Sequence, residues 1–408
     1  MLTATEERTI ATRKLILRDA LSILSLVLIT IVLFGFTLLL FRSFSAHRTD
    51  LAKRWSERGR RALHAGRPAE AMIDLRTALT YAPGTRSYEL LLAQALGEAG
   101  RTEESYNYFM GLWEAQPGDG FINLELARLA IKRNDPRAAL NFYRASIYGT
   151  WEGDGVARRA QVRMELAHYL IQRNQPALAR LELQIIAGNS PNNYDLDMKL
   201  GELFQQAGDD ASAAACYQKA LSIRPDEVKA LEAAGSLAYK MDDYGNAYRL
   251  LKKADAERAA KHEAATENSD DLTMMNNAAR LMELEPSPKQ PSKERVHRII
   301  AARQIARKRL DSCSSHFASG GQLPPAMMSL ETRWDGPDGT TQTSALLRDS
   351  AQQDAAMQLV YDTEQQTEKL CGPATGDDAL LLQLANKYAG SQSASVPGSQ
   401  PEAVMSAK

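Results

Sequence analysis

The chain has 408 residues, with 49 lysine and arginine side chains against 50 aspartate and glutamate side chains. This near-neutral balance gives no global field that would favour nucleic acid or an anionic surface. The length allows two domains and a tail, and the Ala- and Leu-rich composition with little β-branched alternation predicts an all-α fold. The three cysteines form no CxxC pair or Cys/His cluster, which argues against structural zinc.

Residues 1–19 are predicted to form a short N-terminal tail before an apolar segment. The segment from Ala20 to Phe41 carries no charged side chain. As a helix it would reach about 33 Å, enough to cross a hydrocarbon layer of about 30 Å. A cleaved signal peptide usually has a shorter apolar core, of about 7–15 residues, followed by a small-x-small site that is not evident here. We therefore predict one uncleaved transmembrane helix over residues 20–41.

The orientation of this helix is less well defined, because four basic residues precede it and four follow it. They are Arg8, Arg13, Lys14 and Arg18 before the helix, and Arg42, Arg48, Lys53 and Arg54 after it. The last two belong to the first folded repeat, and large domains translocate largely regardless of charge. We expect a cytoplasmic N-terminus and a periplasmic body at a bacterial inner membrane, and the reverse orientation stays open.

A pattern that recurs about every 34 residues, within the range typical of repeat proteins, runs through residues 51–261. Its first member is a small residue at which two helices would cross. A large apolar side chain follows on the next turn of the helix, and a third apolar or small residue on the turn after that. The positions are Ala71, Ser105, Ala139, Ala179, Ala213 and Ala247; Leu75, Phe109, Tyr143, Leu183, Tyr217 and Leu251; and Ala78, Leu112, Ser146, Ile186, Ala220 and Ala254. The intervals between copies are equal, except that the one from Ala139 to Ala179 contains a short insertion. A fixed period of this size predicts a solenoid, whose units bury their apolar faces against their neighbours.

The best copies also carry the remaining positions of a known repeat. The first has Trp55, Gly59, Ala71, Leu75, Ala78 and Pro83, and the fifth has Leu200, Gly201, Phe204, Ala213, Tyr217, Ala220 and Pro225. This pattern resembles the tetratricopeptide repeat, a pair of antiparallel helices. The third copy departs from it with Trp151 in place of the closing proline, and the sixth lacks that proline. The resemblance implies a right-handed α-solenoid of about six helix pairs.

In tetratricopeptide arrays the first helices of successive units line a concave groove that holds an extended peptide or a partner helix. Carried onto this sequence, that face comprises Arg60, Leu90, Gln94, Leu124, Arg128, Met164, His168, Met198, Glu202, Gln205 and Tyr239. Its mixture of polar, methionine and aromatic side chains suits protein recognition. The family's carboxylate clamp for chaperone tails is not reproduced, because its Lys and Asn positions in the first repeat hold Ser56 and Arg60.

Residues 270–389 lose the period but keep helical patterns, so a smaller helical region is predicted there. The expected helices are Leu272 to Leu284, Ser292 to about Ser312, Ala345 to Leu370 and Ala379 to Leu384. The second is basic, but no aromatic residues interleave with its arginines, which favours a solvated or partner-facing helix over a nucleic-acid site. Residues 390–408, rich in Ser, Ala, Pro and Gln, are predicted to be disordered.

Cys313 and Cys371 each end one of these helices. If the two helices were antiparallel neighbours, the thiols would not need to be close. In an oxidising compartment a bridge between them would stabilise the fold by roughly 4 kcal/mol. Two unpaired thiols in a reduced cytosol are the alternative, while Cys216 lies in a repeat where a small buried residue is expected.

No catalytic motif is present: the sequence has no HExxH, GxSxG, GxxxxGK[ST] or GxGxxG pattern. We therefore expect no enzymatic activity, cofactor or metal. The predicted function is a single-pass membrane scaffold that binds protein partners in envelope assembly or secretion. One alternative is a cytosol-facing regulator of envelope lipid or polysaccharide synthesis, and another is an enzyme whose active part lies in the C-terminal helical region. The oligomeric state cannot be derived.

Overall fold

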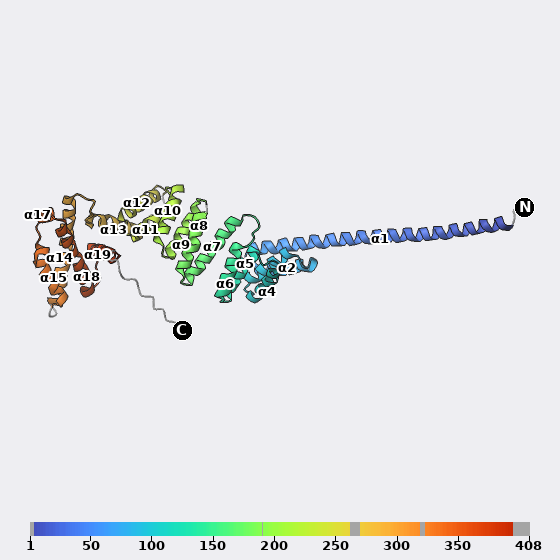
Figure 1. Ribbon diagram of the computed structural model, residues 1–408, viewed down its shortest axis with the longest axis horizontal. Helices are drawn as coiled ribbons and strands as arrows, with labels where there is room; N and C mark the ends of the chain where they lie inside the picture. Colours follow the sequence, from blue (N-terminus) through green and yellow to red (C-terminus); the bar gives the residue numbers. More distant parts are fainter. Residues whose placement is uncertain (1–3, 190, 262–269, 319–322, 395–408) are drawn as a thin grey trace. The chain divides into compact units, whose positions relative to one another are not determined.

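The structure is a computed structural model that describes residues 4–189, 191–261, 270–318 and 323–394. These residues form nineteen helices, α1 to α19, and no strand, which confirms the predicted all-α class (Figure 1). The chain divides into two compact units, residues 1–169 and 170–408. Each unit is described by itself below.

Helix α1 (Ala4–His64) begins unit 1 as one uninterrupted helix of 61 residues (Figure 1). From Ile16 to His64 it is long and apolar enough to cross a membrane, and its large apolar side chains from Ile16 to Phe44 are exposed. The sequence predicted a separate tail over residues 1–19 and a gap at residues 42–50 before the first repeat. Residues 4–19 and 42–50 are helical instead, because these stretches contain neither Gly nor Pro.

The end of α1 and the next eleven helices alternate as first and second helices of six pairs, as the sequence predicted. The remaining helices are α2 (Pro68–Tyr81), α3 (Arg86–Glu98), α4 (Thr102–Ala115), α5 (Gly120–Lys132), α6 (Pro136–Tyr148), α7 (Gly155–Gln172), α8 (Pro176–Asn189), α9 (Tyr194–Gln206), α10 (Asp210–Ile223), α11 (Val228–Lys240) and α12 (Tyr244–Ala260). Side-chain caps mark several starts: Asp209 accepts from the backbone N–H of Ser212, and Asp243 from that of Asn246.

The repeat positions found in the sequence form the interior of the pairs. All eighteen are buried, and the largest exposed fraction among them is 7%, at Leu112. Each first helix also carries a buried glycine or alanine, at positions 59, 93, 127, 167, 201 and 235. The sequence pattern therefore fixes which face of each helix turns inward.

Gly201 shows how tightly the two helices of a pair approach. A Cβ atom at this position would lie 2.4 Å from Cε1 of Tyr217, the large residue of the same repeat. We expect Gly201→Ala to lower the free energy of unfolding by about 1–3 kcal/mol, because the tyrosine ring is rigid and buried. The matched control is Gly188→Ala in α8, where nothing lies within 4 Å of the added methyl group.

Thermal unfolding followed by circular dichroism at 222 nm measures both variants. Gly188→Ala should keep or raise Tm, because alanine is about 1 kcal/mol better than glycine inside a helix. Equal Tm values for the two variants would contradict the close packing of α9 on α10.

The C-terminal part of unit 2 holds α13 (Asp270–Leu284), α14 (Ser292–Ala318), α15 (Pro325–Asp335), α16 (Pro337–Thr340), α17 (Thr343–Leu346), α18 (Ser350–Cys371) and α19 (Asp377–Ala394). Four features differ from the sequence prediction. Helix α14 continues past Ser312, and α15 lies in a stretch for which no helix was predicted. The helix predicted from Ala345 to Leu370 is interrupted at residues 347–349, so α17 and α18 are separate helices. Helix α19 continues into residues 390–394, which were predicted to be disordered. The rest of the predicted disordered tail, residues 395–408, lies outside the described residues.

These helices share one apolar core with the last repeat. Tyr244 and Ala247 of α12 belong to the same buried cluster as Leu281 of α13, Leu310 of α14 and Val360 of α18. The end of the repeat array is therefore covered by the C-terminal helices. An uncovered last repeat would expose this apolar surface to water, so the C-terminal region serves as its cap.

Helices α14 and α18 lie side by side and run parallel, not antiparallel. Near their starts, the Ser292 hydroxyl donates to the Leu347 carbonyl, 3.2 Å away, and further along Arg309 Nε donates to Thr367 Oγ1 over 2.8 Å. The antiparallel arrangement considered from the sequence is wrong for these two helices. The intervening helices α15 to α17 bring the chain back before α18 begins, and this return places the two C-terminal ends together.

Candidate functional site

The predicted groove residues of unit 1 differ in how much of each side chain is available. Arg60 and His168 are exposed, and Leu90, Gln94 and Met164 are half-buried. Leu124 is only 6% exposed and belongs to the interior. Arg60 lies 3.4 Å from Glu57 on the same helix, an exposed pair that leaves its guanidinium accessible.

Arg128 is held within an ion cluster of its own unit. Its Nε and Nη2 atoms lie 2.8 and 2.7 Å from the two carboxylate oxygens of Glu165, and its Nη1 lies 2.7 Å from Glu125. The Tyr143 hydroxyl donates to the same Glu165 over 3.0 Å. A bidentate pair of this kind joins α5 to α7. Arg128 therefore positions the first helices of two repeats.

The carboxylates of this cluster have shifted pKa values. Burial raises the pKa of Glu125, against the opposing effect of Arg128. Burial alone would also raise the pKa of Glu165, but the hydrogen bonds from Arg128 and Tyr143 outweigh it and hold this pKa below its ordinary value. Burial together with Glu165 raises the pKa of Tyr143. The first-helix face of unit 1 thus carries an ion-paired, hydrogen-bonded network flanked by exposed polar groups.

In unit 2, Glu202 is exposed and Met198 is half-buried, as a contact surface requires. Gln205 instead accepts a hydrogen bond of 2.7 Å from the Tyr217 hydroxyl of its own repeat. Tyr239 donates to Gln383 of α19 over 3.0 Å and packs against the C-terminal core. Tyr239 was nominated from repeat position alone, and the sequence could not show that a helix much later in the chain covers it.

Residues 198–227, which span most of α9 and all of α10, match a sequence model of the tetratricopeptide repeat. The array is built of tetratricopeptide repeats. The other pairs bury the same three positions at the same period, so they are further copies of this unit. Repeats of this type typically bind other proteins, so the match supports a protein-interaction role.

Solved structures with a similar arrangement include tetratricopeptide proteins. Pseudomonas aeruginosa PilF is 14% identical and covers 51% of this chain and 91% of its own, with a TM-score of 0.39. PilW, named a type IV pilus biogenesis factor, is 14% identical and covers 55% of this chain and 98% of its own, with a TM-score of 0.40. The C-terminal part of a Cytophaga hutchinsonii repeat protein is 12% identical and covers 77% of this chain and 97% of its own, with a TM-score of 0.42. No curated protein sequence matches the chain.

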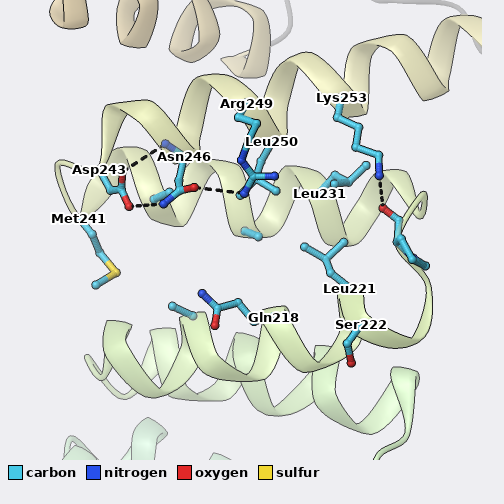
Figure 2. A pocket seen from close by; sticks show the side chains of 14 residues that line it. Gln218, Leu221, Ser222, Leu231, Met241, Asp243, Asn246, Arg249, Leu250 and Lys253 are labelled. Carbon is cyan, nitrogen blue, oxygen red and sulfur yellow. Dashed lines mark hydrogen bonds between the residues drawn. The ribbon is translucent and has the colours of Figure 1, made fainter.

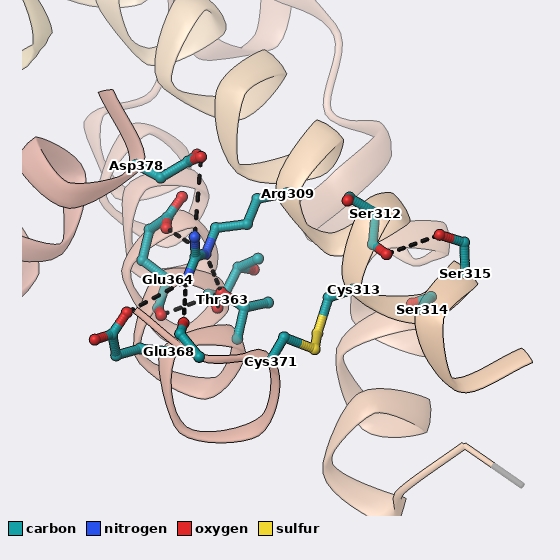
Figure 3. The surroundings of a disulfide bond; sticks show 12 residues. Arg309, Ser312, Cys313, Ser314, Ser315, Thr363, Glu364, Glu368, Cys371 and Asp378 are labelled. Carbon is teal, nitrogen blue, oxygen red and sulfur yellow. Dashed lines mark hydrogen bonds and ion pairs between the residues drawn. A yellow bond between two sulfur atoms is a disulfide. The ribbon is translucent and has the colours of Figure 1, made fainter. Parts of the chain in front are cut away.

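A second notable centre lies in the C-terminal helices, where Cys313 of α14 and Cys371 of α18 form a disulfide (Figure 3). Their Cα atoms are 5.8 Å apart. Cys313 is buried, whereas Cys371 is exposed at the end of its helix. Parallel packing of α14 and α18, which the sequence did not reveal, is what brings the two thiols together. Cys216 is the free cysteine, and burial raises its pKa to about 11.

Arg309 joins the same helices beside the disulfide (Figure 3). Its guanidinium lies 3.3 Å from both Glu364 and Glu368, and it donates to the Gly372 carbonyl over 3.0 Å. Asp378 of α19 lies 4.0 Å away. One cation thus faces three carboxylates and a carbonyl. The sequence offered only the spacing of the arginines in α14 as a signal, and a basic stretch cannot show which arginine turns inward.

Glu364 is the most deeply buried acid of this cluster, with no exposed surface. Neither of its carboxylate oxygens has a hydrogen bond. Burial and the neighbouring Asp378 raise the pKa of Glu364 to about 8, although Arg309 acts in the opposite direction. Burial outweighs the attraction of Arg309, whose guanidinium is shared among several acids. The raised pKa favours the protonated form of Glu364 at neutral pH.

This protonation gives a testable pH dependence. The folded protein keeps a proton on Glu364 that the unfolded chain releases near pH 4.5, so stability falls as pH rises from about 4.5 to 8. The slope from this group approaches about 1.4 kcal/mol per pH unit, and it disappears above about pH 8. Glu364→Gln, which stays neutral, should remove this contribution.

Denaturant unfolding between pH 5 and pH 9 measures the slope for each variant. The matched control is Glu368→Gln, which alters a half-exposed acid on the same arginine and should leave the slope in place. If wild type and Glu364→Gln showed the same pH dependence, the protonated state of Glu364 would be contradicted.

Within the described ranges no group of three or more His, Cys, Asp and Glu side chains is arranged to hold a metal ion. The ion clusters around Arg128 and Arg309 join helices of the same unit. Their geometry accounts for packing and for the shifted pKa values. The residues that remain accessible on the first-helix faces are the ones suited to contact a partner.

Proposed function

We propose that this protein is a membrane-tethered tetratricopeptide scaffold that holds a protein partner on the faces of its first helices during envelope assembly or secretion. The exposed groove residues Arg60, His168 and Glu202 would contact the partner. Arg128 and Gln205 would act by holding neighbouring helices in place. The mechanism is tethering: confinement at the membrane raises the effective concentration of a weakly bound protein.

The continuity of α1 is the observation that carries this proposal. The apolar segment and the first helix of the first repeat belong to one helix without a linker. Between Phe41 and Leu51 the helix advances about 15 Å, so the first repeat would stand within about that distance of the bilayer. A stiff connection of this kind limits how far the repeats of unit 1 can move from the membrane surface.

The proposed compartment is the periplasm of a bacterial cell. The disulfide between Cys313 and Cys371 supports this choice, because such bonds persist in oxidising compartments and are rare in the cytosol. The equal numbers of basic residues on the two sides of the span do not oppose it. In this orientation the N-terminus is cytoplasmic and the repeats face the envelope.

Site-specific photo-crosslinking in intact cells tests the partner surface. A photoreactive residue is placed at His168 on α7 or at Glu202 on α9, and the matched control position is the exposed Arg144 on the second helix α6. We expect both first-helix positions to give an adduct with the same partner, while Arg144 gives none. Equal adducts from all three positions, or none from His168 and Glu202, would contradict the proposal.

A further inference from the structure

A groove lies in unit 2 between the second helices α10 and α12, with the first helix α11 as its floor (Figure 2). Its volume of about 530 Å³ lies within the range of small-molecule sites, about 300–1,000 Å³. Leu221 of α10, Leu231 of α11 and Leu250 of α12 line it with apolar surface. Tyr239 lies on a different side of α11, so this groove is separate from the predicted partner groove.

Two alanines account for the groove. Ala234 and Ala238 of α11 occupy positions that hold larger residues in the second, fourth and fifth repeats, namely Leu92 and Leu96, Leu166 and Leu170, and Leu200 and Phe204. Those larger side chains are all buried, at 3% exposure or less. With methyl groups in their place, the space between the two second helices is left open.

The groove is too narrow to take in a helix. Its floor from Leu231 to Met241 is about 15 Å long, at about 1.5 Å per helical residue. Spread over this length, the volume gives a mean cross-section of about 35 Å². A helix with its side chains is at least about 10 Å across, or about 80 Å² in section. A partner helix can therefore rest on the rim but cannot fill the floor.

The walls also offer little to an extended peptide. Most lining residues lie within α10, α11 and α12, where backbone N–H and C=O groups bond to each other along the helix. A peptide on this floor would bury amide groups without main-chain partners, which is unfavourable. An unbranched alkyl chain has no polar group to leave unpaired, so it fits the floor better.

The rim adds a positive charge to this apolar floor. Arg249 and Lys253 lie about one turn apart on α12, and Lys253 already holds Asp226 at 2.7 Å. Asp243, an acid that lines the groove, accepts from the Asn246 side chain. The exposed Arg249 donates to Asn246 over 3.1 Å, and among the described residues no carboxylate lies within ion-pair distance of it. An anionic head group at the rim would pair with Arg249.

We propose that the groove binds a single-chain carboxylate, with the alkyl chain along the floor and the carboxylate at Arg249. An extended alkyl chain advances about 1.25 Å per carbon, so a floor of about 15 Å accepts a chain of about twelve carbons. This binding site goes beyond the proposed scaffold function and does not depend on the partner or on the membrane tether.

Photolabelling of the full-length protein in lipid nanodiscs tests the site. The probe is dodecanoate with a diazirine near the end of its chain, and mass spectrometry maps the adduct. We expect labelling within residues 214–253, which line the groove. Unlabelled dodecanoate should compete at least about tenfold better than butyrate, which is too short, or dodecanol, which has no charge.

Filling the floor tests the apolar part of the site. Ala234→Leu with Ala238→Leu copies the fourth repeat and should reduce this labelling at least about tenfold. The matched control is Ala211→Leu with Ala215→Leu, which adds the same groups at exposed positions of α10 outside the groove and should leave labelling unchanged. Circular dichroism at 222 nm confirms that both double variants are folded.

Arg249→Gln tests the head group without altering the helix interior, because Arg249 is exposed. It should reduce labelling by the dodecanoate probe about tenfold and leave labelling by the corresponding dodecanol probe unchanged. The matched control is Lys252→Gln, which removes an exposed charge from the same helix outside the groove.

Two results would overturn the proposal. The first is an absence of labelling within residues 214–253, or labelling there that neither Arg249→Gln nor the floor-filling pair reduces. The second is a protein adduct from a photoreactive residue at Gln218, on the exposed rim, in intact cells without labelling by dodecanoate. That adduct would assign the groove to a polypeptide instead.

Discussion

Deletion of residues 1–41 is expected to move the protein from the membrane fraction to the soluble fraction. The sixteen Leu, Ile, Val and Phe side chains between residues 20 and 41 favour insertion by about 0.3–0.6 kcal/mol each, or about 5–10 kcal/mol together. From Ile16 onward these side chains are exposed, so no part of the described fold competes with lipid for them. The first repeat begins beyond the deletion and should stay folded.

Sodium carbonate extraction followed by immunoblotting measures the distribution. The full-length chain should stay in the carbonate-resistant pellet, and the deleted chain should be soluble with an unchanged helical circular dichroism signal per residue. Deletion of residues 395–408 is the control and should not alter the distribution. A mature protein that lacks its first residues by mass spectrometry would identify the segment as a cleaved leader and contradict the anchor.

Loss of the bond between Cys313 and Cys371 is expected to cost about 4 kcal/mol of the free energy of unfolding, on the chain-entropy estimate for a separation of 58 residues. The bond joins the C-terminal ends of α14 and α18, which share a core with the last repeat. The double variant Cys313→Ala/Cys371→Ala should therefore unfold at lower denaturant concentration and expose the end of the array earlier.

Counting thiols in the denatured protein shows whether the bond is present. Material from cells should release one reactive thiol, from Cys216, before reduction and three thiols after it. Cys216→Ala is the control for the stability measurement, because it removes a buried side chain without touching the bond. Three thiols before reduction, or equal stability with and without reductant, would contradict the disulfide.

The repeat core could be predicted from the sequence because its information is local and repeated. The positions of Ala213, Tyr217 and Ala220 hold a small residue, a large residue, and an apolar or small residue in all six copies. Because these positions are buried in every copy, they show which face of each helix turns inward. The long apolar helix was equally readable, since it depends only on the apolar, uncharged sequence from Ala20 to Phe41. In both cases the prediction needed no knowledge of residues far along the chain.

The accessible part of the candidate site could not be read in this way. Arg128 has the right position in its repeat, yet its guanidinium is held by Glu165, 37 residues later. Tyr239 also has the right position but is covered through Gln383, at a separation of 144 residues. Repeat position predicts the direction of a side chain, whereas its availability depends on partners that periodicity does not encode.

The C-terminal region was the least predictable because its order depends on tertiary packing. The apolar patterns of the sequence predicted helices near α14 and α18. Their parallel arrangement depends on α15 to α17, which carry the chain back to the start of α14 and were not predicted. The environment of Glu364 arises from this packing. A single glutamate in an amphipathic helix gave no sign that it would be buried and protonated.

The side of the membrane that holds the repeats is tested most directly by reporter fusions after Lys408. Alkaline phosphatase is active only after export, and green fluorescent protein exported through the general secretion route stays dark. We predict active alkaline phosphatase and no fluorescence from the two fusions. Strong fluorescence with an inactive phosphatase would place the repeats in the cytosol and contradict the periplasmic scaffold.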